Sequence, residues 1–100
     1  MEGYNVRILP HAKVDFLDIV DHLNTLSPEA AAKYYEQLVE KTETLMTAPD
    51  HYPIAKDTQL RLRGYRILQI DEYIVFFVIR GKTVQIRRIL YARRQFRQLF

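Results

Sequence analysis

The fold is decided by residues 73–91, which read YIVFFVIR, then GK, then TVQIRRILY. The segment Tyr73–Arg80 is almost wholly apolar, which is typical of a strand in the middle of a sheet with both faces covered. Gly81 and Lys82 then predict a two-residue turn, with glycine at the first central position of a type II′ hairpin. The segment Thr83–Tyr91 reads as the returning strand. These residues therefore predict a β-hairpin at the centre of a sheet.

A further strand is predicted just before this hairpin, at residues 60–70. Its first half alternates leucine with Arg61 and Arg63, so the leucines are expected to face the core and the arginines to face outward. Strict alternation would turn Arg66 inward. We expect a β-bulge at Gly64 to shift the phase and bring Arg66 onto the face of the other two arginines.

Two helices are predicted before these strands. Pro10 opens the first, since proline suits the first helical turn, and Ser27 and Pro28 cap and open the second. Helical spacing predicts that the following residues form the apolar faces: Phe16, Val20, Leu23 and Leu26, then Ala31, Tyr35, Leu38, Thr42 and Leu45. Asp15, Asp18 and Asp21 are expected on a solvated face of the first helix.

Residues 4–9 alternate loosely and predict an N-terminal strand. The element order is then β-α-α-β-β-β, and the two helices are close enough in sequence to form an antiparallel hairpin. We therefore expect an α+β fold, in which the N-terminal strand and an antiparallel three-strand meander form one sheet packed against the helical hairpin. One hundred residues predict a single domain over residues 1–100.

The composition excludes several kinds of chemistry. The chain has no cysteine, which excludes disulfides, zinc ribbons, iron–sulfur clusters and thiol nucleophiles. The three histidines show no metal-ligand spacing, so no metal site is expected, and no cofactor is expected either. The single serine, Ser27, is used as a helix cap, so serine hydrolase chemistry is not expected. The longest apolar run, residues 74–79, is too short to span a bilayer, and no signal peptide is visible. A cytoplasmic location without membrane contact is expected.

Positive charge gathers in the C-terminal part of the sequence. Residues 1–57 carry five basic and ten acidic residues, a net charge of −5, whereas residues 58–100 carry ten basic and two acidic residues, a net charge of +8. Nine of those ten basic residues are arginine, whose planar fork pairs bidentately with phosphate or carboxylate. The asymmetry favours a polyanion or an acidic protein as partner, although the two halves could also partly neutralise each other.

Three groups of residues are candidates for chemistry. Arg61, Arg63 and Arg66 on one face would form a phosphate cradle, or else a solvated outer face. Arg87 and Arg88 are adjacent in a strand, so their side chains are expected to point to opposite faces.

Tyr91 follows at the end of the last strand, beside Arg93 and Arg94. It is a candidate for proton transfer, with a structural aromatic residue as the alternative.

Together these features resemble a known family. The element order, the step Gly64-Tyr65-Arg66, the apolar strand Tyr73–Arg80 and the ending IRRILYARR at residues 86–94 are similar to the RelE/ParE superfamily of toxins from bacterial type II toxin–antitoxin modules. The resemblance covers essentially the whole chain. It implies a toxin neutralised by a cognate antitoxin that is acidic and partly disordered until it binds. Arg61, Arg63 and Arg87 are then expected to contact that antitoxin.

The resemblance leaves the target open. RelE-like members cleave mRNA in the ribosomal A site, and this is the first expectation here, which makes the chain an endoribonuclease. It implies Arg66, Tyr91, Arg61 and Arg94 as catalytic residues and Arg63, Arg88 and Arg93 as contacts to RNA phosphate. Arg61 falls near a catalytic lysine of these enzymes, but their lysine pair is not present.

Two alternatives remain. ParE-like members poison DNA gyrase without cleaving RNA. The last possibility is a toxin that now only binds its antitoxin and helps to repress its operon.

Overall fold

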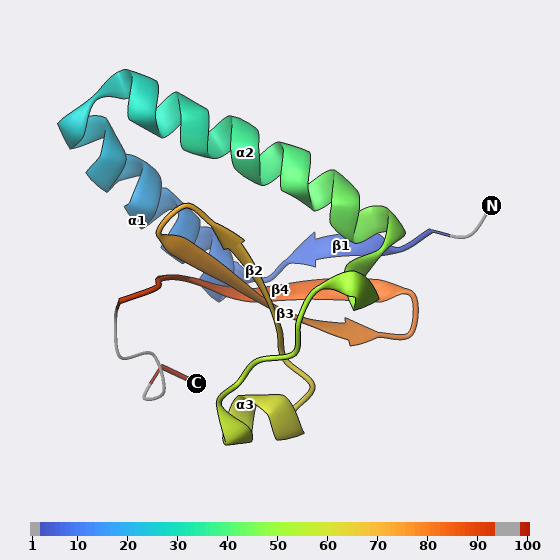
Figure 1. Ribbon diagram of the computed structural model, residues 1–100. Coiled ribbons are helices and arrows are strands. Elements are labelled where there is room, and N and C mark those ends of the chain that lie inside the picture. Colours follow the sequence, from blue (N-terminus) through green and yellow to red (C-terminus); the bar gives the residue numbers. More distant parts are fainter. Residues whose placement is uncertain (1–2, 94–98) are drawn as a thin grey trace.

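The chain forms a four-stranded sheet with a helical hairpin across one face (Figure 1). The computed structural model describes residues 3–93 and 99–100. The elements in chain order are β1 (Asn5–Ile8), α1 (Pro10–Leu26), α2 (Pro28–Thr47), a 3₁₀ turn (Pro49–His51), α3 (Thr58–Leu62), β2 (Arg66–Ile70), β3 (Tyr73–Arg80) and β4 (Thr83–Tyr91). The strand order is β1-β4-β3-β2, with β1 parallel to β4 and the other neighbours antiparallel. The predicted α+β fold is confirmed.

The hairpin β3–β4 is the centre of the sheet, as its sequence predicts. Residues 75–78 of β3 are all buried, because successive side chains enter cores on opposite faces of the sheet. Gly81 has a φ of +60°, at the turn position where a positive φ favours glycine. Both edges of β3 are hydrogen-bonded, by β2 on one side and β4 on the other.

The two helices meet at Ser27, which ends α1 and begins α2. Its backbone N–H donates to the carbonyl of Leu23, and its hydroxyl accepts from the backbone N–H of Ala30 at 2.9 Å. A proline stands in the first turn of each helix, where its missing N–H is not needed. A single residue therefore joins the two helices, which form an antiparallel hairpin over the sheet (Figure 1).

The buried face of the helices differs from the predicted stripe at two positions. Tyr34 is 3% exposed and Tyr35 is 55% exposed, the reverse of the prediction. The Tyr34 ring reaches down to Tyr73 of the sheet, with centroids 5.2 Å apart, whereas Tyr35 only borders Phe16 of α1. Leu26 is 68% exposed because it is the last residue of α1, beside the turn between the helices.

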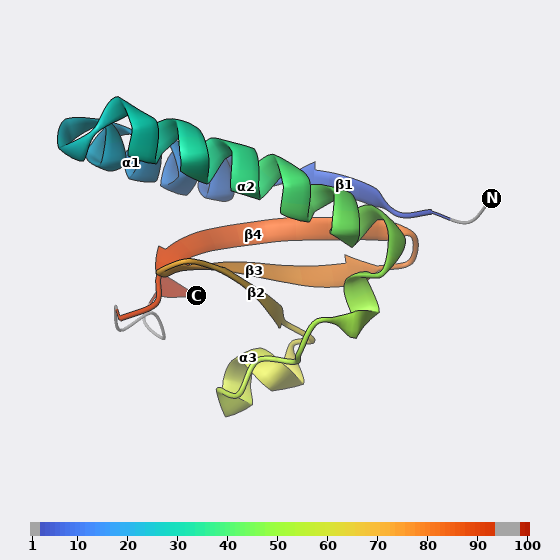
Figure 2. The ribbon, with the colours of Figure 1, turned by 45° about the horizontal axis from the view of Figure 1, so that its top comes forward.

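The opposite face of the sheet, the side on which α3 lies (Figure 2), carries a second core. It consists of Ala55, Leu60, Tyr65, Phe76, Val78 and Leu90, with Leu99 and Phe100 packed against it. The Phe100 ring lies edge-on to Tyr65 and Phe76, with centroids 5.0 and 5.1 Å apart. The sheet is therefore the middle of three layers, with the segment before β2 and the last two residues on the side away from the hairpin.

Residues 60–65 do not form a strand, which corrects the sequence prediction. The Asp57 carboxylate accepts from two backbone N–H groups and so caps the short helix α3. Gly64 has a φ of +82°, the left-handed conformation that commonly follows a helix end, and it does not form a bulge in a strand. The strand begins only at Arg66.

Removal of the Ser27 hydroxyl tests the hinge of the hairpin. We expect Ser27→Ala to lower the free energy of unfolding by about 1 kcal/mol, because the Ala30 N–H loses its acceptor. Urea unfolding followed by circular dichroism measures this change. Ser27→Asn, which keeps a capping oxygen, should retain most of the stability, and equal losses in the two variants would contradict the assignment.

Candidate functional site

Arg61 and Arg63 lie on and just after α3, on the side of the sheet away from the helical hairpin (Figure 2). Both residues are exposed. Because α3 is not part of the sheet, neither shares a strand face with Arg66. The predicted cradle of three arginines on one strand face is therefore not formed, and this is a correction to the sequence analysis.

Arg66 is held by the loop that follows α2. Its Nη1 donates to the backbone carbonyls of Asp50 and Tyr52, at 3.1 and 2.7 Å. The backbone pairs there as well, since Arg66 forms an isolated antiparallel bridge with Ile54. The guanidinium thus fixes this loop against the first residue of β2, and part of its hydrogen-bonding capacity is already used by the protein.

Arg66 and Tyr91 lie toward opposite ends of the sheet. Arg66 pairs with Phe77 across β2 and β3, whereas Tyr91 pairs with Tyr73 across β3 and β4. Phe77 and Tyr73 are four residues apart on β3, so the two positions are separated along the strands by about 13 Å at about 3.3 Å per residue. The two side chains proposed to act together on one phosphate are therefore not adjacent.

Arg88 forms a buried ion pair with Asp15 of α1. Its Nε donates to Asp15 Oδ2 at 2.7 Å and its Nη2 donates to Oδ1 at 2.9 Å, which makes the pair bidentate. Both side chains are 10% exposed. The hydrogen bond to Asp15 raises the pKa of Arg88 and outweighs the effect of burial, so the guanidinium stays charged.

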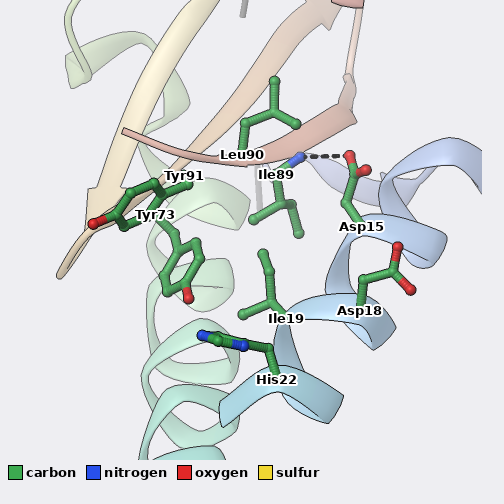
Figure 3. A pocket seen from close by; sticks show the side chains of 8 residues that line it. All are labelled: Asp15, Asp18, Ile19, His22, Tyr73, Ile89, Leu90 and Tyr91. Atoms are coloured by element: carbon green, nitrogen blue, oxygen red, sulfur yellow. Dashed lines mark hydrogen bonds between the residues drawn. The ribbon is translucent and has the colours of Figure 1, made fainter. Parts of the chain in front are cut away.

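The same pair connects three parts of the chain. Asp15 Oδ2 also accepts from the backbone N–H of Ile89 at 3.0 Å (Figure 3), and Arg88 Nη1 donates to the carbonyl of Leu99 at 2.9 Å. Arg88 is thus placed in the interior and not on a surface for RNA. Asp15 is likewise not on a solvated helix face, contrary to the prediction.

Arg87 lies at an irregular point of β4. The register with β3 shifts between Phe76 and Phe77, so Arg87 has no directly opposed partner, and Ile86 and Leu90 belong to cores on opposite faces. The Arg87 guanidinium lies 5.7 Å from the centroid of the Tyr65 ring and donates to Gln85 Oε1 at 2.9 Å.

Beside Arg87 the surface is hollowed. The hollow is about 460 Å³ and lies at the start of α1, where His11, Tyr65 and Phe100 also line it. Among the described residues, Arg87 with Arg61 and Arg63 are the predicted antitoxin contacts, and all three keep at least part of their side chain at the surface. The structure does not gather them into one patch on one strand face.

Tyr91 lies at the rim of a pocket of about 240 Å³ between α1 and the ends of β3 and β4 (Figure 3). It is 36% exposed, and its ring is 5.7 Å from that of Tyr73. Of the described residues that line this pocket, two are the carboxylates Asp15 and Asp18 and none is an arginine. On this side the described surroundings of Tyr91 are therefore acidic and aromatic, while Arg93 follows two residues later and Arg94 lies outside the described residues. Burial, Glu72 and Tyr91 together raise the pKa of Tyr73, so its phenol stays protonated.

The last two arginines predicted for the site, Arg93 and Arg94, follow β4. Arg93 is exposed and approaches Glu72 only loosely, at 3.8 Å. Arg94 lies outside the described residues. Within the part of the chain that is described, no group of three histidine or acidic side chains could hold a metal ion, and no helix is long and apolar enough to cross a membrane.

Several residues of the site were missed by the sequence reasoning. Asp15 stands between the buried residues Ala12 and Ile19 at helical spacing, which was the available signal that its carboxylate faces inward. The carbonyls that bind Arg66 carried no signal, because the fold of an irregular loop is not readable from periodicity.

Comparison with known proteins identifies relatives of this chain. The family described as "ParE toxin of type II toxin-antitoxin system, parDE" matches residues 6–96. The solved structure of the chromosomal ParDE TA system from P. aeruginosa superposes with a TM-score of 0.74 at 24% sequence identity, over 89% of this chain and 96% of that chain. At that identity the superposition shows a shared fold. No curated protein sequence matches significantly.

The buried ion pair predicts a large difference between two aspartates of α1. We expect Asp15→Ala to lower the free energy of unfolding by about 3 kcal/mol, because it leaves the Arg88 charge buried without its partner. Asp18→Ala, one turn away on the exposed side, should change it by less than about 0.5 kcal/mol. Urea unfolding of both variants measures the contrast, and equal effects would show that the pair does not hold α1 to β4.

Proposed function

The chain belongs to the ParE toxin family of type II toxin–antitoxin systems, and from that premise we propose that it arrests growth by binding DNA gyrase until a cognate antitoxin neutralises it. The observation that carries the proposal is the match to the ParE family over residues 6–96. From the sequence alone, mRNA cleavage is the first expectation and gyrase the second. The match to ParE, rather than to a RelE-like nuclease, reverses that order.

The geometry of the arginines supports the same choice. Cleavage of RNA through the ribose 2′-OH needs a phosphate clamp and a proton-transfer group around one scissile bond. Here Arg66 binds loop carbonyls, Arg88 is paired with Asp15, and Tyr91 lies toward the other end of the sheet from Arg66. A protein that acts by binding has no need for such convergence.

We also propose that the antitoxin contacts Arg61, Arg63 and Arg87. Arg61 and Arg63 are exposed on and just after α3, and Arg87 lines the hollow at the start of α1. An acidic segment that folds on binding would pair with these guanidinium groups and gain affinity from charge complementarity. Because both cores share the one sheet, we further propose that residues 1–100 fold as one domain.

Pulse labelling after induction without the antitoxin tests the target. We expect DNA synthesis to fall first, with DNA-damage signalling and filamentous cells, while incorporation of labelled amino acids continues. Labelled thymidine and labelled methionine are followed in parallel in one culture. A prompt stop in protein synthesis, with cleaved mRNA, would overturn the gyrase proposal in favour of the nuclease.

Tyr91→Phe is the matched variant for this experiment. Phenylalanine keeps an aromatic ring against Tyr73 but cannot transfer a proton, so the fold is expected to be retained. A gyrase-binding toxin should stay toxic with Tyr91→Phe, whereas a nuclease that uses this hydroxyl should lose most of its toxicity. Circular dichroism of the purified variant confirms that any loss is not due to unfolding.

A further inference from the structure

Arg7 and Arg87 lie on neighbouring strands, on the face of the sheet where α3 lies (Figure 2). Val6 and Ile8 pack into the core beneath the helices, so Arg7, which stands between them on β1, points to the opposite face. β1 and β4 are parallel, and Arg7 is the direct partner of Gln85. Arg87 Nη2 donates to Gln85 Oε1 at 2.9 Å. The two arginines therefore flank one glutamine on the open face of the sheet.

The Arg87 guanidinium is held in place but is not neutralised. Its Nε and Nη2 donate to Gln85 Oε1, and its Nη1 donates to the Tyr65 hydroxyl at 3.5 Å. A guanidinium has five N–H groups, so two remain for a ligand. Neither Arg87 nor Arg7 forms an ion pair with any residue that the structure describes. The charge of Arg88, by contrast, is balanced by Asp15.

The sheet itself supplies no negative charge to balance these two arginines. All residues of β1, β2, β3 and β4 are described, and none of them is aspartate or glutamate. Like charges on neighbouring strands repel each other. Carboxylates from a partner would remove this repulsion and pair with the guanidinium groups, so the strip formed by Arg7, Gln85 and Arg87 favours an anionic ligand.

An apolar hollow continues this basic strip. Leu9 follows Arg7 by two residues and lines the hollow of about 460 Å³ at the start of α1, which Arg87, Leu99 and Phe100 also line. No residue that lines this hollow, among those described, is acidic. Positive charge and an apolar space are therefore neighbours on this face, which suits a ligand that carries both carboxylates and an apolar side chain.

The aromatic ring beside the strip favours a peptide over a nucleic acid. Single-stranded nucleic acids gain much of their affinity by stacking bases on exposed aromatic rings. Here the Arg87 guanidinium lies 5.7 Å from the centroid of the Tyr65 ring, and the Phe100 ring packs against the same ring. Tyr65 is only 4% exposed, so a base cannot stack on it.

The strand register matches the repeat of an extended peptide. Arg7 lies opposite Gln85, and Arg87 follows two residues later on β4. The two arginines are thus offset along the strands by about 6.6 Å, at about 3.3 Å per residue. Alternate side chains of an extended peptide point the same way and repeat at that distance. Two carboxylates in alternate positions fit the arginines, and an apolar side chain two residues further on reaches the hollow.

We infer that Arg7, Arg87 and the hollow beside them form one surface that binds an extended segment of the antitoxin with the pattern acidic, any residue, acidic, any residue, apolar. The two carboxylates pair with the arginines, and the apolar side chain enters the hollow. The inference rests on the proposed contact between the antitoxin and Arg87, and it adds Arg7 to that contact.

Titration of the purified full chain with the peptide acetyl-ESESL-amide, followed by NMR, tests the surface. We expect saturable shifts at the backbone amides of Arg7, Leu9 and Gln85. Acetyl-QSQSL-amide lacks the charges and should bind at least tenfold more weakly, and acetyl-ESESG-amide lacks the apolar side chain and should bind at least threefold more weakly. Equal binding of all three peptides, or tighter binding of a six-nucleotide oligothymidylate than of ESESL, would overturn the inference.

Variants separate the surface from the fold. Arg7→Gln changes an exposed side chain, so we expect unchanged stability but at least fivefold weaker binding of ESESL. Arg87→Lys keeps the charge but loses the planar fork, and it should weaken binding similarly. Lys41→Gln, an exposed charge change on α2, should leave binding unchanged. Full affinity of Arg7→Gln would contradict the proposed contact.

The complex of the chain with its cognate antitoxin tests the source of the segment. ESESL should give no saturable shifts with this complex, because the antitoxin already covers the surface. Undiminished binding of the peptide to the complex would overturn the antitoxin as the occupant. Inhibition of gyrase by the free chain is measured separately, so failure of the proposed target leaves the result with the peptides unchanged.

Discussion

The ion pair between Asp15 and Arg88 joins the layers of this protein. β1 covers the edge of β4 only as far as Ile86, and beyond that point β4 would present an unpaired edge. There the Asp15 carboxylate accepts a hydrogen bond from the Ile89 N–H in place of a strand partner, and its bond to Arg88 holds α1 against the strand. Arg88 in turn binds the carbonyl of Leu99, so helix, sheet and C-terminus meet at one buried charge. Such a pair contributes little when intact, but removal of either partner is costly.

Because Arg88 is buried in this ion pair, the positive charge of the C-terminal half does not all lie on the surface. The arginines looked like one basic surface in the sequence, yet the structure divides them between different tasks. Arg88 and Arg66 bind groups of the protein itself, whereas Arg61 and Arg63 face solvent from α3. This division of the described arginines supports the proposal that the toxin acts by binding and not through a gathered catalytic centre.

The sequence predicted what depends on periodicity and on strong local signals. The apolar run of β3, the Gly81 turn and the cap at Ser27 each specify their structure locally, so the sheet and the hairpin were predicted correctly. The segment before β2 was not, because its alternating leucine and arginine favours a strand. The Asp57 carboxylate instead caps a short helix there, in which Leu60 is buried and Leu62 is exposed. Asp15 was misassigned because its partner is 73 residues away, a distance that no local pattern reveals.

The central claim is that this chain acts by binding gyrase and not by cleaving RNA, and supercoiling by purified gyrase tests it most directly. The purified toxin is titrated into a reaction that contains gyrase, ATP and relaxed plasmid. The account predicts that supercoiling is lost as toxin approaches equimolar amounts with gyrase, and that it returns when the cognate antitoxin is added. Undiminished supercoiling in the presence of a large excess of folded toxin would contradict it.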